Sequence, residues 1–304
     1  VATTNYGKIA KAIGDLKGYG YQVDLPDINR AHLEFFPDIE NHSIVYGLLA
    51  ITNVNTELAQ KIVQNRPYTS VQDFWTKIQP TNVQMISLIK AGCFDKFYAS
   101  RHVAMRTFLR FLAEQKYTKK DKITTANLEK AINFKIIPQE YELAIRVFAF
   151  KKWCEANQLK VETKMMELSD EDGITFFQNY LQDDMKTKNY NVMPDGVIQM
   201  KQSMFNKVIT AKLSKLMEWL NSDDGRTKYY EGEITTFIDE VWQKYCEGTI
   251  STWEMNSLHY YYHDHELAKM SSSAYNLVNF NSLPEDLQPI GKRVNKQGKE
   301  FDVY

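Results

Sequence analysis

The sequence is poor in glycine, proline and cysteine, and it carries almost no net charge. Its 304 residues include 13 glycines, 8 prolines and 3 cysteines, and 37 basic side chains nearly balance 38 acidic ones. So few turn-forming residues favour long helices. The balance of charge leaves no overall field that attracts nucleic acid or membrane, so binding to either requires a local patch.

The cysteines indicate the redox environment of the protein, and the apolar runs are too short for a membrane-spanning helix. Cys93, Cys154 and Cys246 form no CxxC pair, which argues against a disulfide framework or a structural zinc site and favours a reducing cytoplasm. The best apolar run, Ile44–Ile51, is far shorter than the roughly 18 residues of a membrane helix. The chain starts at Val1 without an initiator methionine, so we expect a piece of a longer cytoplasmic protein with no membrane partner.

Apolar spacing in the first third predicts two pairs of short helices, each joined by a tight corner. The first pair is Leu48–Ile51 and Leu58–Val63, with a polar corner at residues 52–56. The second pair is Val71–Ile78 and Val83–Ala91, with a corner at residues 79–82. This repeat of helix, corner and helix predicts a tandem helix-hairpin-helix.

The remainder of the chain predicts a helical bundle. Long amphipathic runs at 103–112, 141–154, 205–220 and 234–246 are separated by charged stretches such as 167–172 and 221–228. Minor β structure is expected near residues 43–46 and at the C-terminus, where Lys292–Tyr304 alternates around Gly298. The predicted fold class is therefore mainly α.

The first corner has the chemistry of a phosphate site. Asparagine tolerates positive φ, so Asn53 and Asn55 are expected to make the bend while Val54 plugs the junction and Thr56 caps the next helix. The unpaired amides at the start of that helix then face outward, where they bind phosphate without reading base sequence. The alternative stays open at this point, because many helix corners only connect and bind nothing.

Four segments, in order, resemble one protein family. They are Leu25–Arg30, Gly47–Asn55, Ser70–Phe74 and Leu88–Asp95. They are similar to the end of the fingers and the tandem helix-hairpin-helix region of the bacterial replicative polymerase, the C-family DNA polymerase III alpha subunit. The resemblance covers about the first third of the chain and implies that the hairpins contact the backbone of a primer-template duplex. The family usually has glycines where this chain has Asn53 and Asn55.

The resemblance also implies a division of the chain. We expect an end-of-fingers segment at 1–30, the tandem helix-hairpin-helix at 31–98, a helical insertion of unknown role at 99–250, and a connector at 251–304. The connector segment Glu254–Leu267 resembles, at Leu258, Tyr261, His265 and Leu267, the family segment before an oligonucleotide-binding barrel. Residues 292–304 then look like the first strand of that barrel.

The family's stretch between hairpins and barrel carries a motif for the sliding clamp. The nearest segment here, Gln202, Met204 and Phe205, is one residue short of the usual spacing, and helix core is the favoured role for Met204 and Phe205. The family's catalytic aspartates belong to a palm that precedes the resembling segment. No block of this chain resembles that palm, so we expect no catalytic residue, no cofactor and no polymerase activity in isolation.

Two other clusters favour structural roles over chemistry. His259, His263 and His265 could share a helix face and bind zinc, but no HExxH motif is present, and we predict no metal site. The acidic runs 170–172 and 183–184 are interpreted as helix caps and solvated faces rather than magnesium ligands.

The first hypothesis is a noncatalytic C-terminal portion of a divergent, phage-encoded DNA-directed DNA polymerase, a nucleotidyltransferase, that binds primer-template duplex. Its predicted DNA-binding residues are Thr52, Asn53, Val54, Asn55, Thr56, Lys61, Lys77, Asn82 and Lys90. Further basic residues, Lys96, Arg101, Arg106 and Arg110, extend this patch, with a solvated helix face as the equal alternative. The second hypothesis is a helical module that docks a sliding clamp or another replisome protein, with the hairpins only architectural.

Overall fold

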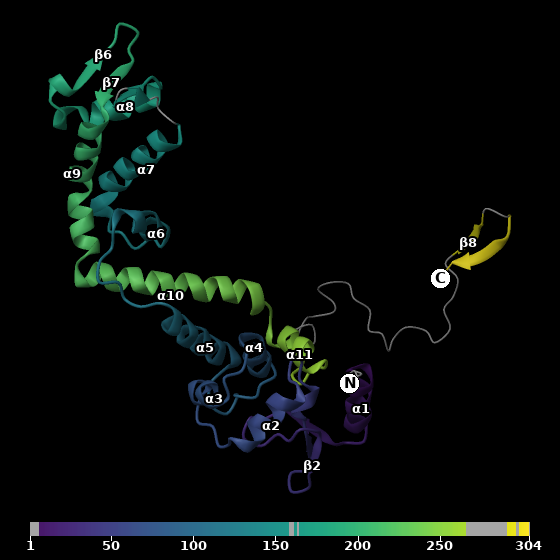
Figure 1. Ribbon diagram of the computed structural model, residues 1–304. Helices are drawn as coiled ribbons and strands as arrows, with labels where there is room; N and C mark the ends of the chain where they lie inside the picture. Colours follow the sequence, from purple (N-terminus) through teal and green to yellow (C-terminus); the bar gives the residue numbers. More distant parts are fainter. Residues whose placement is uncertain (1–5, 158–160, 163, 266–290, 296–297, 304) are drawn as a thin grey trace. The chain divides into compact units, whose positions relative to one another are not determined.

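The computed structural model describes residues 6–157, 161–162, 164–265, 291–295 and 298–303. Helices dominate these ranges, and the strands form three small sheets (Figure 1), so the predicted mainly α class is confirmed. The chain divides into two units. The first comprises Val1–Tyr68, Lys77–Lys96 and Gly248–Tyr304, and the second comprises Thr69–Thr76 and Phe97–Glu247. The boundaries predicted at residues 30, 98 and 250 stay predictions.

The first unit begins with helix α1 (Tyr6–Gly18) and a three-stranded sheet. The strand order is β1 (Gln22–Asp24), β3 (Ser43–Val45) and β2 (Phe36–Asp38). β1 and β3 are parallel, with Val23 opposite Ile44, and β2 is antiparallel to β3. The strand predicted near residues 43–46 is β3. A 3-10 helix, η1 (Leu48–Ala50), follows β3 and leads into the first corner.

Three α-helices complete the hairpin region of the first unit. They are α2 (Thr56–Gln64), α4 (Asn82–Lys90) and α11 (Ile250–Leu258), and α11 packs against α4. Helix α3 (Val71–Ile78) lies between α2 and α4 in sequence, and the division between the units falls within it. The tandem helix-hairpin-helix predicted from the sequence is therefore confirmed.

The segment Leu25–Arg30 fastens the sheet to the hairpins within the first unit. The Asn29 side chain donates to the Tyr68 carbonyl (2.7 Å) and accepts from the Tyr68 amide (2.8 Å). The Ile28 amide donates to the Cys93 carbonyl (2.9 Å). Because Ile28 and Tyr68 are also buried, this segment acts as a fixed support for the helices that follow it.

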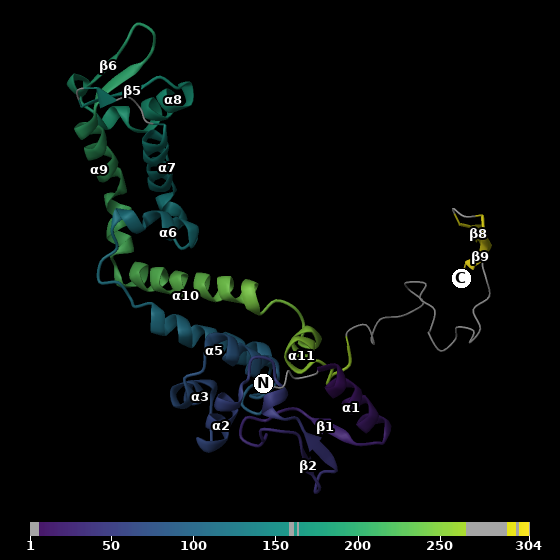
Figure 2. The same ribbon diagram turned by 45° about the vertical axis from the view of Figure 1, so that its right-hand side comes forward.

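The second unit contains a pair of long helices and a smaller α/β part. Its helices after α3 are α5 (Arg101–Lys116), α6 (Leu128–Asn133), α7 (Glu142–Ala156), α8 (Glu171–Tyr180), α9 (Gln202–Leu220) and α10 (Asp223–Tyr245). Within this unit α5 runs beside α10 and α7 runs beside α9 (Figure 2). Short 3-10 turns occur at Thr125–Asn127, Gln139–Tyr141, Gln182–Asp184 and Thr187–Asn189.

A four-stranded antiparallel sheet in the second unit was not predicted from the sequence. Its order is β4 (Val161–Glu162), β5 (Met165–Leu168), β7 (Ile198–Lys201) and β6 (Tyr190–Val192). Met166 opposite Met200 and Leu168 opposite Ile198 face a core shared with α7, α8 and α9. The bundle expected at 99–250 is therefore a helical unit with a small sheet built into it.

Two further segments differ in detail from the sequence expectation. Residues 223–228, expected in a charged connecting stretch, are the first turns of α10, because the Ser222 side chain accepts from the Gly225 amide and starts the helix. At the C-terminus, β8 (Gly291–Val294) and β9 (Glu300–Val303) form an antiparallel pair rather than a single strand. Leu267 and Tyr304 lie outside the described residues.

Candidate nucleic-acid interface

The first corner bends at Asn53, as the sequence predicts. Asn53 has a φ of 64°, in the left-handed region, and its side chain donates to the Ser87 hydroxyl of α4 (2.9 Å). Val54 is 8% exposed and fills the junction between η1 and α2. The bend and the apolar plug are therefore confirmed at this corner.

The helix cap at this corner is Asn55, so the predictions for Asn55 and Thr56 are wrong. Asn55 has extended backbone angles rather than positive φ, and its side chain accepts from the Leu58 amide (2.9 Å). Thr56 is the first residue of α2, one position too late to be the cap. A single left-handed residue is enough for the turn, which leaves Asn55 in the extended conformation that an N-cap needs.

Asn55→Ala is expected to lower the free energy of unfolding by about 1 kcal/mol, because α2 loses the acceptor for its Leu58 amide. Asn55→Asp keeps an acceptor and should unfold at nearly the same urea concentration as the parent chain. Thr56→Ala should cost clearly less than Asn55→Ala. A larger loss for Thr56→Ala in urea titrations would contradict this assignment of the cap.

Thr52 is occupied by contacts with the end of α11. Its amide donates to the Ser257 carbonyl (3.0 Å) and its hydroxyl to the Asn256 carbonyl (2.9 Å). The hydroxyl also lies 2.9 Å from Nε2 of His259, whose pKa is lowered by burial, so the ring favours its neutral form. Thr52 therefore anchors the corner, and its contact with DNA stays a prediction.

At the second corner, the first amides of helix α4 are exposed and, among the described residues, unpaired. Gln79 has a φ of 51°, and Thr81 caps α4 with a complete capping box in which the Thr81 amide also donates to the Gln84 side chain (2.9 Å). Asn82 and Val83, the first two residues of α4, are exposed. Within the described ranges, their amides have no hydrogen-bond partner, so both remain available to an anion.

The two corners differ in charge. The first turn of α2 contains the exposed acid Glu57, whereas the first turn of α4 contains no acidic residue. A carboxylate at a helix N-terminus stabilises the helix, but it also competes with and repels a phosphate. The start of α4 is therefore the better anion site of the two.

The three predicted DNA-binding lysines all have partners within the first unit. Lys61 donates to the Ile78 carbonyl (2.6 Å), Lys77 donates to the Pro67 carbonyl (2.8 Å), and the Lys90 ammonium lies 5.7 Å from the ring centre of Trp253. These lysines stabilise the hairpins as they stand. A phosphate contact would have to compete with those interactions, and it stays a prediction.

The other basic residues of the predicted patch are also engaged. Lys96 pairs with Asp27 (2.7 Å), and Arg106 lies over the ring of Trp242 (4.7 Å). Arg110 donates to both carboxylate oxygens of Glu231, which raises the pKa of the guanidinium. The side chain of Arg101 is buried. Much of this positive charge is therefore offset by protein groups, which the sequence could not reveal because Arg110 and Glu231 are 121 positions apart.

The segment considered for clamp binding begins helix α9. Gln202 is exposed at its first position, Met204 is partly buried, and Phe205 is 3% exposed in the core of the second unit. The structure thus has Met204 and Phe205 in the core role that the sequence analysis favoured. A clamp contact here stays a prediction, and it would require that core to open.

The histidine and acidic clusters have structural partners. His263 Nδ1 lies 2.7 Å from the buried carboxylate of Glu254, and His259 contacts Thr52. Asp170 caps α8 by accepting from the Gly173 amide (3.0 Å). Among the described residues, no group of three or more histidine, cysteine, aspartate or glutamate side chains is arranged to hold a metal ion.

Comparison with known proteins supports a helix-hairpin-helix in the first third of the chain. The family model of the helix-hairpin-helix motif matches residues 20–104, which include both corners. The chain is also similar along its whole length to two DNA polymerases. It is 32% identical over 311 aligned residues to the probable DNA polymerase YorL of Bacillus subtilis and, with the same identity, to the DNA-directed DNA polymerase of Bacillus phage SPbeta.

A shorter match reaches the cellular replicative enzymes. The chain is 33% identical over 105 residues to the DNA polymerase III alpha subunit of Caulobacter vibrioides, a match that covers 32% of this chain and 9% of that protein. The resemblance to this family is therefore confirmed, and the chain is a polymerase-related region that carries a helix-hairpin-helix. It spans about a quarter (23%) of the length of the two whole-length relatives. In the described ranges, no helix has both the length and the apolar character needed to cross a membrane.

Proposed function

We propose that this chain is a noncatalytic portion of a replicative DNA polymerase that binds primer-template duplex through sequence-independent phosphate contacts. The carrying observation is the start of α4, where two exposed residues, Asn82 and Val83, have unpaired amides in a first turn free of acidic side chains. Such a helix start binds one phosphate oxygen through its amides and through the positive end of the helix dipole.

The corner at α2 takes a secondary part in this proposal. Its helix start is also exposed, and the Asn53 side chain links the corner to Ser87 of α4 within the same unit. Glu57 weakens its attraction for a phosphate. The proposed contact is therefore strongest at α4, and a second phosphate of the same backbone is the natural ligand for the weaker site.

The test is the binding of the full chain to a fluorescein-labelled primer-template duplex at several salt concentrations in EDTA. Contacts with two to four phosphates predict that the logarithm of the association constant falls with the logarithm of salt concentration with a slope of about −2 to −4. Two duplexes of unrelated sequence should bind alike. No binding at low salt, or binding indifferent to salt, would contradict the proposal.

The same samples test the noncatalytic part of the proposal. Supplied with deoxynucleotides and magnesium, the chain should not extend the primer, because polymerase chemistry needs paired carboxylates that the family's palm supplies. Addition of nucleotides by the isolated chain, absent from a mock purification, would overturn this part and leave the duplex binding to be judged separately.

A second candidate function is partner docking by the second unit. It is favoured by the observation that residues 69–76 and 97–247 form a unit with its own hydrophobic core, and that neither hairpin corner, 52–56 or 79–82, belongs to this unit. Charge reversal at Lys61, Lys77 and Lys90 is a poor way to separate the two functions, since all three lysines also hold the hairpins together. A substitution at an exposed residue of α4 separates them better.

A further inference from the structure

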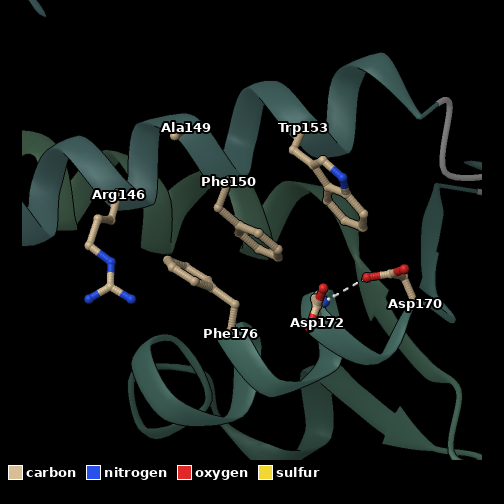
Figure 3. A pocket seen from close by; sticks show the side chains of 8 residues that line it. Arg146, Ala149, Phe150, Trp153, Asp170, Asp172 and Phe176 are labelled. Carbon is tan, nitrogen blue, oxygen red and sulfur yellow. Dashed lines mark hydrogen bonds between the residues drawn. The ribbon is translucent and has the colours of Figure 1, made fainter.

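A pocket of about 450 Å³ lies between α7 and α8 in the second unit. Figure 3 shows its walls, with Ala149, Phe150 and Trp153 on one helix and Phe176 on the other. Two aspartates and one arginine complete the lining. Neither the hairpins nor the proposed DNA contact uses this pocket.

The apolar wall of the pocket is a set of stacked aromatic rings. Phe150 stacks on Phe176 with 4.4 Å between ring centres and on Trp153 with 5.8 Å, at interplanar angles of 24° and 14°. Phe150 is buried, whereas Trp153 and Phe176 are half-buried and turn part of their surface to the pocket. Gly173 allows this arrangement, since a Cβ there would lie 3.0 Å from the Trp153 ring. These contacts hold the three rings in one stack along the wall.

The charges of the pocket are unevenly distributed. One carboxylate oxygen of Asp170 accepts from the Gly173 amide (3.0 Å), and Asp172 follows in the first turn of α8. Within the described part of the chain, Asp172 has neither an ion pair nor a hydrogen bond. Arg146 comes from the opposite end of the pocket, where its guanidinium lies over the ring of Tyr180 (4.8 Å). Two carboxylates against one guanidinium leave the lining with an excess of negative charge.

We propose that this pocket binds the cationic side chain, arginine or lysine, of a partner protein. A cation is attracted to the faces of aromatic rings and to carboxylates, and the pocket offers both at its Trp153 end. Arg146 at the other end repels a second cation and attracts a carbonyl or carboxylate that follows in the partner chain. This inference rests on the second candidate function and identifies the surface that would perform it.

An unpaired nucleotide is the competing occupant, because bases also stack on aromatic rings. Its phosphate would have to sit beside Arg146 in a pocket whose other charges are Asp170 and Asp172. The excess of negative charge disfavours a polyanion. The two occupants predict opposite changes in affinity for Arg146→Gln and Asp172→Asn, and this difference distinguishes them.

The experiment uses the full chain labelled with fluorotryptophan and follows the Trp153 resonance by ¹⁹F NMR, with the signal assigned from Trp153→Phe. The probe is a capped glycine-serine pentapeptide with one central arginine, and its control is the same peptide with uncharged citrulline. The arginine peptide should shift the Trp153 resonance and bind about five-fold more tightly than the citrulline peptide. Equal binding of the two peptides, or no shift with either, would overturn the proposal.

Matched variants identify the carboxylate. Asp172→Asn should weaken binding of the arginine peptide by about five-fold. Glu171→Gln removes the same charge one position away, at an exposed residue that does not line the pocket, and should leave binding nearly unchanged. Arg146→Gln should leave binding unchanged or strengthen it. An equal loss of peptide affinity in Asp172→Asn and Glu171→Gln would mean that only the general negative potential of this surface attracts the peptide. That result would contradict the proposal.

Ala149→Phe provides a test that does not depend on charge. Ala149 is exposed and lines the pocket, so a phenyl group there fills the space without removing a core contact. Binding should be abolished while circular dichroism and the melting temperature are unchanged. The opposite result would be a shift of the Trp153 resonance by oligothymidylate, with binding of the oligonucleotide weakened by Arg146→Gln and strengthened by Asp172→Asn. In that case the occupant is a nucleotide and the proposal is wrong. This result would not affect duplex binding through α4.

Discussion

Aspartate in place of Val83 is expected to weaken binding of primer-template duplex by about ten-fold at low salt, because a carboxylate about 6 Å from a bound phosphate costs roughly 1–3 kcal/mol. Val83 is 45% exposed at the second position of α4, beside the amides proposed to bind the phosphate. The fold should not suffer, since a carboxylate in the first turn interacts favourably with the helix dipole. Fluorescence anisotropy with a labelled duplex measures the effect.

Val103→Asp is the matched control for this variant. Val103 is 47% exposed in the first turn of α5, which also contains no acidic residue. The change in charge, side chain and helix position is thus nearly the same, but α5 is not part of the proposed DNA contact. An equal loss of affinity in both variants would mean that overall charge governs binding and would remove α4 from the mechanism.

Gly225→Ala is expected to lower the stability of the second unit by about 3 kcal/mol, the upper range for overpacking. Gly225 lies in the first turn of α10, where the chain turns sharply out of α9. A Cβ at this position would lie 2.2 Å from the Trp219 carbonyl oxygen and 2.7 Å from Cα of Leu220. Both are main-chain atoms, so relief requires the corner between the two helices to open.

Gly14→Ala makes the same chemical change where nothing opposes it. Gly14 lies inside α1, and a Cβ there meets no atom within 4 Å. Alanine should stabilise that helix by about 0.5–1 kcal/mol, because it loses less backbone entropy than glycine. Thermal unfolding followed by tryptophan fluorescence compares the variants. A Gly225→Ala protein that melts as the parent does would show that the close approach of α9 and α10 is not needed.

The hairpins could be predicted from the sequence because their determinants are local. In each pair, two apolar runs separated by a short corner, at residues 52–56 or 79–82, specify helix, corner and helix. Asn53 is a residue type that tolerates the left-handed bend. The cap was misassigned by one position because Asn55 and Thr56 are both good caps. Only the backbone conformation, extended at Asn55, distinguishes them.

The sheet of the second unit could not be predicted in the same way. β5 (Met165–Leu168) and β7 (Ile198–Lys201) have four residues each, and Ile198 is the single β-branched residue in the two strands. Helix α8, two 3-10 turns and β6 lie between them in the sequence. Their pairing, Met166 with Met200, exists only as a long-range contact. The partners of the basic residues could not be predicted either, because they are also long-range contacts. Arg110 meets Glu231 only after α10 has folded beside α5.

The predicted DNA-binding set therefore divides into two groups. The sequence predicts the starts of α2 and α4 to within two residues, and Asn82 remains exposed at the start of α4. Residue type alone cannot distinguish a lysine available to phosphate from one that donates to a carbonyl, as Lys61 does to Ile78. Main-chain amides at the start of α4, rather than cationic side chains, are thus the more secure part of the proposed interface.

The anchoring of the first corner by α11 has a consequence for the order of synthesis on the ribosome. The Thr52 hydroxyl donates to the Ser257 carbonyl 205 residues later, and the Tyr46 hydroxyl donates to the Leu258 carbonyl 212 residues later. At about 5–20 residues per second, roughly 10–40 s pass between the translation of the two partners. The nascent hairpins therefore wait for the whole second unit to emerge before their last hydrogen bonds can form.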